Sequence, residues 1–334
     1  MSTRVVLGLV AVAAAAVAPI VAQGQTQTTA ARANAAPAYT VPMTPWGHPD
    51  VQGTWDYRSI TPLERPQQFG DRAFLTDEEV KEMEARANRR MDEPPTTVRG
   101  GLIHAEYWTD PGRTVTESRR TSLIIDPPNG RIPPSVGGGG RGGGRRGGGP
   151  ARQGGRADSW LDRSALERCI TWGMPSNIFP GLYNNNIQIV QSPSHVAITH
   201  EMVHDTRVVP FSSDPYPSEV LSQWLGHSRA RWEGQTLVVE TTNFNGKISY
   251  RGSSPTLRIT ERYTRIGPDA IDFKITFEDP TTWTAPWTAA YLMRTSEGPL
   301  YEYACHEGNY GLRNILEVAR DEEAAAAAAA AAKE

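Results

Sequence analysis

The sequence lacks the fingerprint Gly-x-x-x-x-Gly-Lys-Ser/Thr, with which many nucleotide-binding proteins hold phosphates. It also lacks an excess of either charge, because 34 Lys and Arg side chains stand against 37 Asp and Glu side chains and leave a formal net charge of -3. A nearly balanced charge creates no field that would favour a polyanion as partner. The sequence therefore predicts that nucleic acid is not a partner.

Long apolar runs are also scarce, and the clearest lies at the N-terminus. Residues 1–22 contain Arg4, an apolar run over 5–17, a break at Pro19 and the small residue Ala22. This layout is typical of a secretory signal peptide cleaved near Ala22, whereas an uncleaved anchor is disfavoured because the run is short and rich in alanine. No later segment approaches about 18 apolar residues. We expect a periplasmic or extracellular protein without a membrane span after cleavage.

Cysteine is nearly absent, since the chain has only Cys169 and Cys305. In an oxidising compartment, two cysteines form a bridge more often than they form a redox or metal site. We therefore predict a disulfide between Cys169 and Cys305. A bridged Cys305 cannot act as the nucleophile that its neighbours His306 and Glu307 would otherwise suggest.

Short β-type segments separated by turn residues dominate the second half of the chain. Four hairpins are predicted, with turns at 192–194, 233–234, 267–269 and 296–299, and the last has a second strand at 300–305. Residues 271–277, in the segment 270–277, alternate strictly between apolar and polar side chains, as a half-buried strand does. We predict a mainly β fold: an antiparallel meander, curved sheet or lipocalin-like barrel of about eight strands.

The ends and one insertion of the chain have compositions that differ from this β-rich part. We predict a disordered leader over 23–41, a single β-rich domain over 42–320, a disordered Gly/Arg insertion at 137–156 and an Ala-rich helical tail over 321–334. Thr76 and Glu79 form a capping box that predicts a peripheral helix to about Arg90. A second short helix is predicted over 159–168.

The segment His200-Glu201-Met202-Val203-His204 matches the His-Glu-x-x-His motif of zinc peptidases. On a helix both histidines would face one zinc ion and Glu201 would activate the bound water. On a strand their Cα atoms would lie about 13 Å apart, at roughly 3.3 Å per residue, so one ion could not hold both imidazoles. The β-branched residues of 196–209 favour the strand, and a zinc-dependent hydrolase stays the alternative.

The strand interpretation gives the same histidines another role. Val196, Ile198, His200, Met202 and His204 would share the inward face of an extended segment over 196–209. In a barrel wide enough for a ligand, inward polar groups orient the bound molecule. Equally, they would be core histidines that bond to neighbours. We take His200, Met202 and His204 as candidate ligand-binding residues, with His306 and Glu307 at the rim.

One further motif is weaker. Gly226-His-Ser-Arg-Ala230 is similar to the Gly-x-Ser-x-Gly nucleophile elbow of hydrolases. That motif requires a strand before the serine and a helix after it. Here a second β-type segment follows. The motif therefore does not predict a serine nucleophile.

Several blocks resemble a widespread family of secreted bacterial proteins of unknown function. The most specific is Trp-Glu-Gly-Gln-Thr-Leu-Val-Val-Glu-Thr-Thr-Asn-Phe at 232–244, and another is Tyr-Glu-Tyr-Ala-Cys-His-Glu-Gly-Asn-Tyr at 301–310. The family pattern Glu-x-x-His-x-x-Arg matches Glu201, His204 and Arg207, but the family usually has no histidine at the position of His200 and has Asp at that of His227. The resemblance implies that the zinc motif arose here by a local substitution.

Together these patterns predict an exported protein that binds a small, partly apolar molecule in a β-barrel-like cavity. Two alternatives stay open: a zinc-dependent hydrolase that uses His200 and His204, and a structural or interaction protein of the cell envelope. The ligand and the oligomeric state do not follow from the residues.

Overall fold

A computed structural model describes residues 39–92, 109–136, 157–218 and 220–332. The predicted signal peptide, the leader up to residue 38 and the Gly/Arg insertion at 137–156 lie outside the described residues. Among the described residues, neither α-helix is long and apolar enough to cross a membrane.

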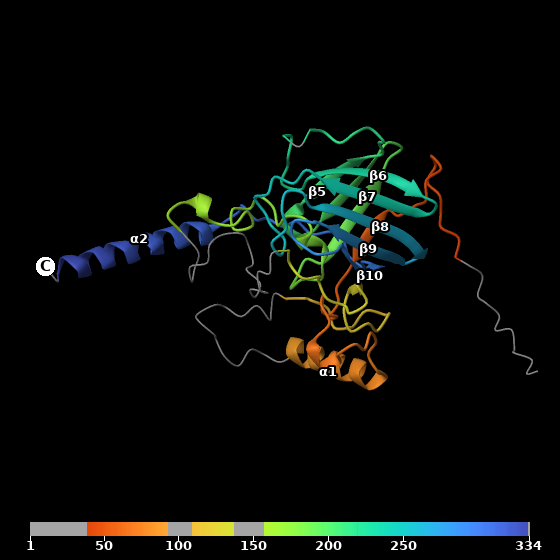
Figure 1. Cartoon of the computed structure of the whole chain (residues 1–334), viewed down its shortest axis with the longest axis horizontal. Coiled ribbons are helices and arrows are strands. Elements are labelled where there is room, and N and C mark those ends of the chain that lie inside the picture. The colour runs from red at the N-terminus through yellow and green to blue at the C-terminus, as the bar shows by residue number, and fades with distance from the viewer. Residues whose placement is uncertain (1–38, 93–108, 137–156, 219, 333–334) are drawn as a thin grey trace, which may run out of the picture. The chain divides into compact units, whose positions relative to one another are not determined.

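The described chain forms a ten-stranded antiparallel sheet that is nearly closed into a barrel, which confirms the predicted fold class (Figure 1). The neighbours follow the order β5-β4-β3-β1-β10-β9-β8-β7-β6, and β2 pairs with β10. The strands are β1 (Gly53–Asp56), β2 (Ile124–Asp126), β3 (Asn186–Gln191), β4 (His195–His200), β5 (Thr206–Pro210), β6 (His227–Glu233), β7 (Thr236–Thr242), β8 (Arg258–Gly267), β9 (Ala270–Glu278) and β10 (Trp287–Thr295).

The order of the strands is not that of one continuous meander. Two meanders, β3-β4-β5 and β6 to β10, lie on either side of β1, which pairs with β3 through Trp55 and Ile187 and with β10 through Trp55 and Thr295. β5 and β6 are the two outer strands of this order, and we call the place where they meet the seam. An isolated parallel bridge between Phe211 and Ala230 joins them there.

The hairpins form where local turn residues allow them. Ser192, Pro193 and Ser194 connect β3 to β4, and Gly234 turns β6 into β7 with a φ of 60°, a region that glycine enters without steric penalty. β8 and β9 form the third predicted hairpin. The fourth prediction was wrong, because residues 300–305 contain no strand and β10 pairs with β9, β1 and β2 instead.

Alternating side chains of the strands fill the inside of the barrel. On β9, Phe273, Ile275 and Phe277 are completely buried, while the residues between them are half-buried. Phe277 stacks on Trp287 of β10 with ring centroids 3.9 Å apart. Such stacking in a close-packed interior leaves few voids larger than a water molecule.

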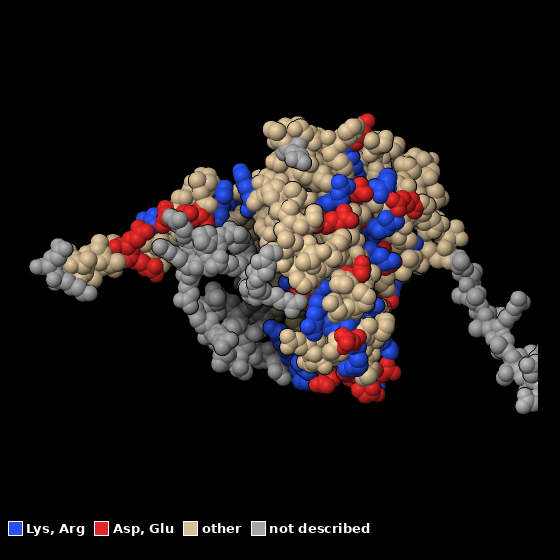
Figure 2. Space-filling model, viewed as in Figure 1, with Lys and Arg blue, Asp and Glu red and all other residues tan. Residues whose placement is uncertain are grey.

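The outer face of the sheet carries charges of both signs. Glu233 pairs with Arg231 at 2.8 Å and with Arg262 at 2.6 Å, and Lys274 pairs with Asp272 at 3.0 Å. Figure 2 shows acidic and basic side chains side by side over this part of the sheet. Exposed pairs of this kind contribute at most about 1 kcal/mol each, so they keep the surface polar more than they stabilise the fold.

Two α-helices accompany the sheet in the described chain. α1 (Asp77–Asp92) begins with the predicted capping box, in which the amides of Thr76 and Glu79 donate to each other's side chains. Its Val80 and Met83 pack on a small cluster that includes Phe69. α2 (Tyr310–Ala331) runs into the Ala-rich tail.

Other helical segments are single 3-10 turns. They are η1 (Gln67–Phe69), η3 (Trp160–Asp162), η4 (Ser176–Ile178) and η5 (Met202–His204). The predicted helix over 159–168 is therefore wrong beyond η3. Its Ser159 and Asp162 form a capping box, but the chain leaves the helical conformation at Arg163.

The predicted disulfide between Cys169 and Cys305 is confirmed. It links residues 136 positions apart and lies beside the start of α2, where Asn309 donates to the carbonyl of Glu167 at 3.1 Å. The bridge thus ties the C-terminal segment to a loop that precedes the sheet strands β3 to β10.

Candidate functional site

The segment over 196–209 is not one continuous strand, and this part of the prediction was wrong. β4 ends at His200 and β5 begins at Thr206, with the tight turn η5 between them. Val203 and His204 adopt φ values of 58° and 47°, which only a few per cent of non-glycine residues do. The turn is closed by the amide of His200, which donates to the carbonyl of Asp205 at 2.8 Å.

The turn separates the candidate residues of the sequence. His200 and Met202 are buried, with 1% and 5% of their surfaces exposed. His204 is exposed and its Nδ1 lies 3.0 Å from the carbonyl oxygen of Tyr303, while His306 and Glu307 are exposed. Two of the five candidate residues are therefore buried and three are exposed, and their contact with a ligand stays a prediction.

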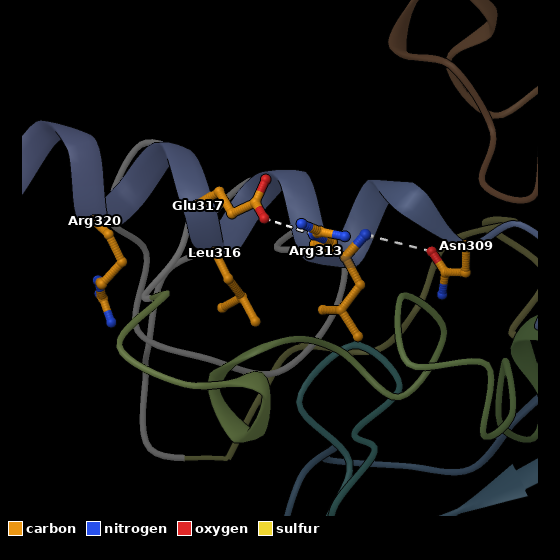
Figure 3. A pocket seen from close by; sticks show the side chains of 6 residues that line it. Asn309, Arg313, Leu316, Glu317 and Arg320 are labelled. Atoms are coloured by element: carbon orange, nitrogen blue, oxygen red, sulfur yellow. Dashed lines mark hydrogen bonds and ion pairs between the residues drawn. The ribbon is translucent and has the colours of Figure 1, made fainter.

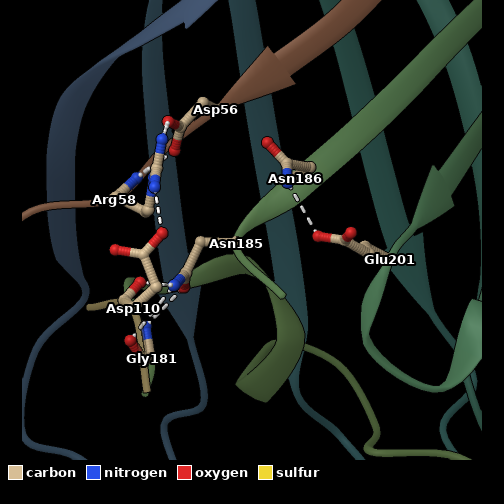
Figure 4. Close-up of polar contacts among 7 residues, drawn as sticks. All are labelled: Asp56, Arg58, Asp110, Gly181, Asn185, Asn186 and Glu201. Carbon is tan, nitrogen blue, oxygen red and sulfur yellow. Dashed lines mark hydrogen bonds and ion pairs between the residues drawn. The ribbon is translucent and has the colours of Figure 1, made fainter. Parts of the chain in front are cut away.

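The helix that a zinc peptidase requires is not formed. Glu201 is buried and its Oε2 accepts a hydrogen bond from Nδ2 of Asn186 at 2.7 Å (Figure 4). In the part of the chain that the structure describes, no three His, Cys, Asp or Glu side chains group closely enough to hold a metal ion. His200 is buried and His204 is exposed, so the two histidines do not share the helix face that the zinc-hydrolase alternative requires.

A polar network near Glu201 is occupied by structural contacts. Asp56 accepts from Nε of Arg58 at 2.7 Å, and the same guanidinium pairs with Asp110. Asn185 donates to the carbonyl of Asp110 at 3.0 Å, so this group joins three separate segments (Figure 4). Its members have protein partners and offer no group that points to a substrate.

The inside of the barrel contains a buried ion pair that the sequence did not reveal. Nη1 and Nη2 of Arg207 lie 2.6 and 2.8 Å from the carboxylate oxygens of Glu261, and both side chains are at most 5% exposed. The Tyr263 hydroxyl donates to the same carboxylate at 2.7 Å. Burial lowers the pKa of Arg207, but Glu261 outweighs it and raises that pKa above its ordinary value, so the guanidinium stays charged.

The position of this pair explains its structural role. Arg207 lies on β5 and Glu261 on β8, and Nη1 of Arg207 is 3.5 Å from Oγ of Ser228 on β6. The side chain of Arg207 thus reaches from one edge of the sheet to the other side of the seam. Where backbone pairing is sparse, a charged side chain connects the strands.

His200 lies beside this ion pair and has no hydrogen-bond partner for either ring nitrogen within the described chain. Burial first, and the charge of Arg207 second, lower the pKa of His200 from 6.5 to about 3. The imidazole is therefore neutral at physiological pH. His200 is thus buried as a core histidine would be, but within the described residues it lacks the hydrogen bonds to neighbours that this interpretation included.

A pH titration of stability tests this state of His200. The unfolded chain protonates His200 near pH 6.5, whereas the folded protein does so only near pH 3, so the free energy of unfolding falls as the pH drops through this window. At about 1.4 kcal/mol per pH unit, His200 alone should remove about 2 kcal/mol between pH 6.5 and pH 5. Urea unfolding of the wild type and of His200→Gln at both pH values should show that difference. Equal pH dependence of the two proteins would contradict it.

The most promising ligand-binding feature is a hollow at the seam, with a volume of about 480 Å³. We call it the seam hollow. Its wall combines residues of β6 and β7, the chain that follows β5, one residue from the β3–β4 turn and one from the N-terminal segment. The lining residues are His48, Pro193, Phe211, Ser212, Ser213, Asp214, Tyr216, Arg229, Ala230, Arg231, Trp232 and Glu240.

Three aromatic rings form one side of the seam hollow. The centroids of Phe211 and Trp232 are 6.2 Å apart and their planes differ by 24°, while His48 lies 5.0 Å from Phe211 and 5.7 Å from Trp232. Their proximity follows from the bridge between Phe211 and Ala230, which places the end of β5 beside β6. A planar apolar group can extend such a stack.

Polar groups of the seam hollow are buried without a partner in the described chain. They are Nε1 of Trp232, Nδ1 of His48 and Nη1 of Arg229. Buried polar groups in native structures nearly always bond to something, whether protein, water or ligand. The combination of apolar rings with a few directed polar atoms is typical of small-molecule sites.

Sequence reasoning missed this site, although it noted some of its residues. Trp232 lies in the block 232–244 that carries the family resemblance, but no sequence pattern assigned Trp232 or His48 to a site. The tryptophan inside an otherwise polar strand segment, Arg231-Trp232-Glu233, was the available signal. Its partners Phe211 and His48 come from other segments, so their convergence has no local signature.

A second hollow of about 410 Å³ lies along α2. Its lining consists of the N-cap residue of α2 and five residues of the helix itself: Asn309, Leu312, Arg313, Leu316, Glu317 and Arg320 (Figure 3). Arg313 and Glu317 pair with each other at 2.6 Å within the helix. Ligand sites bury most of their ligand between converging elements, and one helix face does not provide this.

No protein-family model, curated protein or solved structure matches this chain. The resemblance to secreted bacterial proteins therefore stays a prediction.

Proposed function

We propose that this protein binds a small, partly apolar molecule in the seam hollow. The barrel-like sheet is compatible with ligand binding, and the volume of about 480 Å³ lies within the range of about 300–1,000 Å³ that is usual for such sites. The observation that carries the proposal is the aromatic group of His48, Phe211 and Trp232 with an unpartnered, buried indole N–H.

The hollow at the seam is a better candidate than the inside of the barrel. The interior is filled by the protein's own rings: Trp287 stacks on Phe277, and Phe179 and Tyr250 stack against both with centroids 5.9 to 6.4 Å apart. A ligand there would have to displace this packing. At the seam, Trp232 and Phe211 are only partly buried, so a ligand gains contact without displacing side chains.

Binding of the neutral fluorophore N-phenyl-1-naphthylamine tests the proposal. The naphthyl ring should stack against Trp232 and bind saturably, with a fluorescence increase as it leaves water. Trp232→Ala should weaken the affinity about tenfold, because the variant loses stacking of about 0.5–1.5 kcal/mol and the apolar area of the indole.

The matched control is Trp224→Ala, which removes a tryptophan that does not line the seam hollow. It should bind the fluorophore as the wild type does. No saturable binding, or an equal loss of affinity in both variants, would show that the seam hollow is not the site.

A further inference from the structure

We infer that the ligand of the seam hollow is an aromatic molecule with an acid group, and that Arg229 binds that group. This inference rests on the proposed function and adds the chemical class of the ligand. It follows from how the four charged residues of the hollow, Asp214, Arg229, Arg231 and Glu240, are paired.

The positive charge of Arg231 is already paired with carboxylates of the protein. Its guanidinium lies 2.8 Å from Glu233 and 3.0 Å from Glu240. Among the acidic side chains, Glu240 is held by this pair and Asp214 accepts from the Ser212 hydroxyl at 2.7 Å. Arg231 is therefore engaged by carboxylates of the protein, and Arg229 is the cation of the hollow that is left to attract an anion.

Arg229 differs from Arg231, because it forms no ion pair within the described chain. Its Nη2 donates to the carbonyl of Pro215, and its Nη1 is buried without an acceptor. An unsatisfied buried donor costs about 1–3 kcal/mol, and more when the group is charged. A carboxylate or sulfonate that accepts from Nη1 would remove this cost, and hydrogen bonds between charged groups are about twice as strong as neutral ones.

The guanidinium of Arg229 is also held in place before a ligand arrives. Its Cζ lies 4.7 Å from the ring centroid of Tyr216, and the hydroxyl of Tyr216 donates to the carbonyl of Glu240 at 3.0 Å. The chain that follows β5 thus fixes the arginine against the outer face of the sheet. A preordered donor loses little entropy on binding, which favours a specific orientation of the acid group.

The arrangement therefore requires two parts in one ligand. A planar ring contacts Phe211 and Trp232, and an acid group contacts Arg229, which also lines the hollow. Arg229 and Trp232 lie three positions apart on β6, so their side chains leave the strand on opposite faces and the ligand has to reach from one face to the other at the seam. Neutral aromatic molecules satisfy only the first part and should bind more weakly.

Two fluorophores separate these requirements. 8-Anilinonaphthalene-1-sulfonate has the ring system of N-phenyl-1-naphthylamine with a sulfonate added. The wild type should bind the sulfonate at least about tenfold more tightly at low salt, as expected for one charge-assisted hydrogen bond. Raising the salt to 0.5 M should weaken this preference, because added ions screen exposed charges.

Arg229→Gln should abolish the preference for the sulfonate, and a circular dichroism spectrum like that of the wild type shows that the variant is folded. The control Arg258→Gln removes an exposed arginine outside the hollow and should keep the preference. If the neutral fluorophore binds in a Trp232-dependent way but the preference is absent, or persists in Arg229→Gln, the inference is wrong and the proposed function stands. If neither fluorophore binds saturably, the proposed function fails as well.

Discussion

Replacement of Arg207 by methionine is expected to lower the free energy of unfolding by about 3–5 kcal/mol. The variant leaves the carboxylate of Glu261 completely buried, with Tyr263 as its remaining close donor. An unpaired charge in such a place is costly because water cannot solvate it. Guanidinium unfolding followed by tryptophan fluorescence measures the change.

Two further variants show whether burial is the cause. The double variant Arg207→Met/Glu261→Leu removes both charges and should recover most of the lost stability, since buried ion pairs can be replaced by apolar side chains at little cost. Arg262→Met breaks an exposed pair with Glu233 and should lower the free energy of unfolding by less than about 1 kcal/mol. If Arg207→Met is no more destabilising than Arg262→Met, the buried pair does not have the proposed role.

Removal of the disulfide is expected to have an effect of similar size. The bridge closes a loop of 136 residues, for which restriction of the unfolded chain gives up to about 4–5 kcal/mol. The free energy of unfolding of the wild type should therefore be lower with reductant than without it, by at most about 4–5 kcal/mol. The chain has only two cysteines, so any effect of reductant on the wild type reports on this bridge.

The double variant Cys169→Ser/Cys305→Ser provides the control. It should match the reduced wild type in stability and should not respond to reductant. Identical unfolding of oxidised and reduced wild type would mean that the bridge does not restrict the unfolded chain, contrary to the expectation.

Local sequence was sufficient for the hairpins. The turns at Ser192–Ser194 and at Gly234, and the strict alternation of Phe273 to Phe277, each depend on a few adjacent residues. Because a hairpin pairs neighbours in the chain, its partners need no further information. The three hairpins of this kind were predicted correctly.

The long-range arrangement could not be read from the same patterns. The insertion of β1 between β3 and β10 joins Trp55 to Ile187 and to Thr295, which are remote in the sequence. The turn after His200 uses positive φ at Val203 and His204, and neither residue type signals that conformation. These β-branched and polar residues therefore predicted a longer strand than the one that forms.

In the candidate site, too, the sequence predicted the features that depend on adjacent residues and not those that depend on long-range packing. His200 was correctly expected on the inward face of β4, but its neighbour Arg207 and its distance from His204 depend on how the strands pack. The seam hollow combines His48, Phe211 and Trp232 from three segments. Only the closing of the sheet brings them together, and no local spacing of residues predicts it.

The most direct test of ligand binding at the seam is a crystal structure of the protein with N-phenyl-1-naphthylamine. We predict that the naphthyl ring lies against Phe211 and Trp232, beside the bridge between Phe211 and Ala230. A fluorophore bound instead along Leu312 and Leu316 of α2, or inside the barrel, would contradict the account.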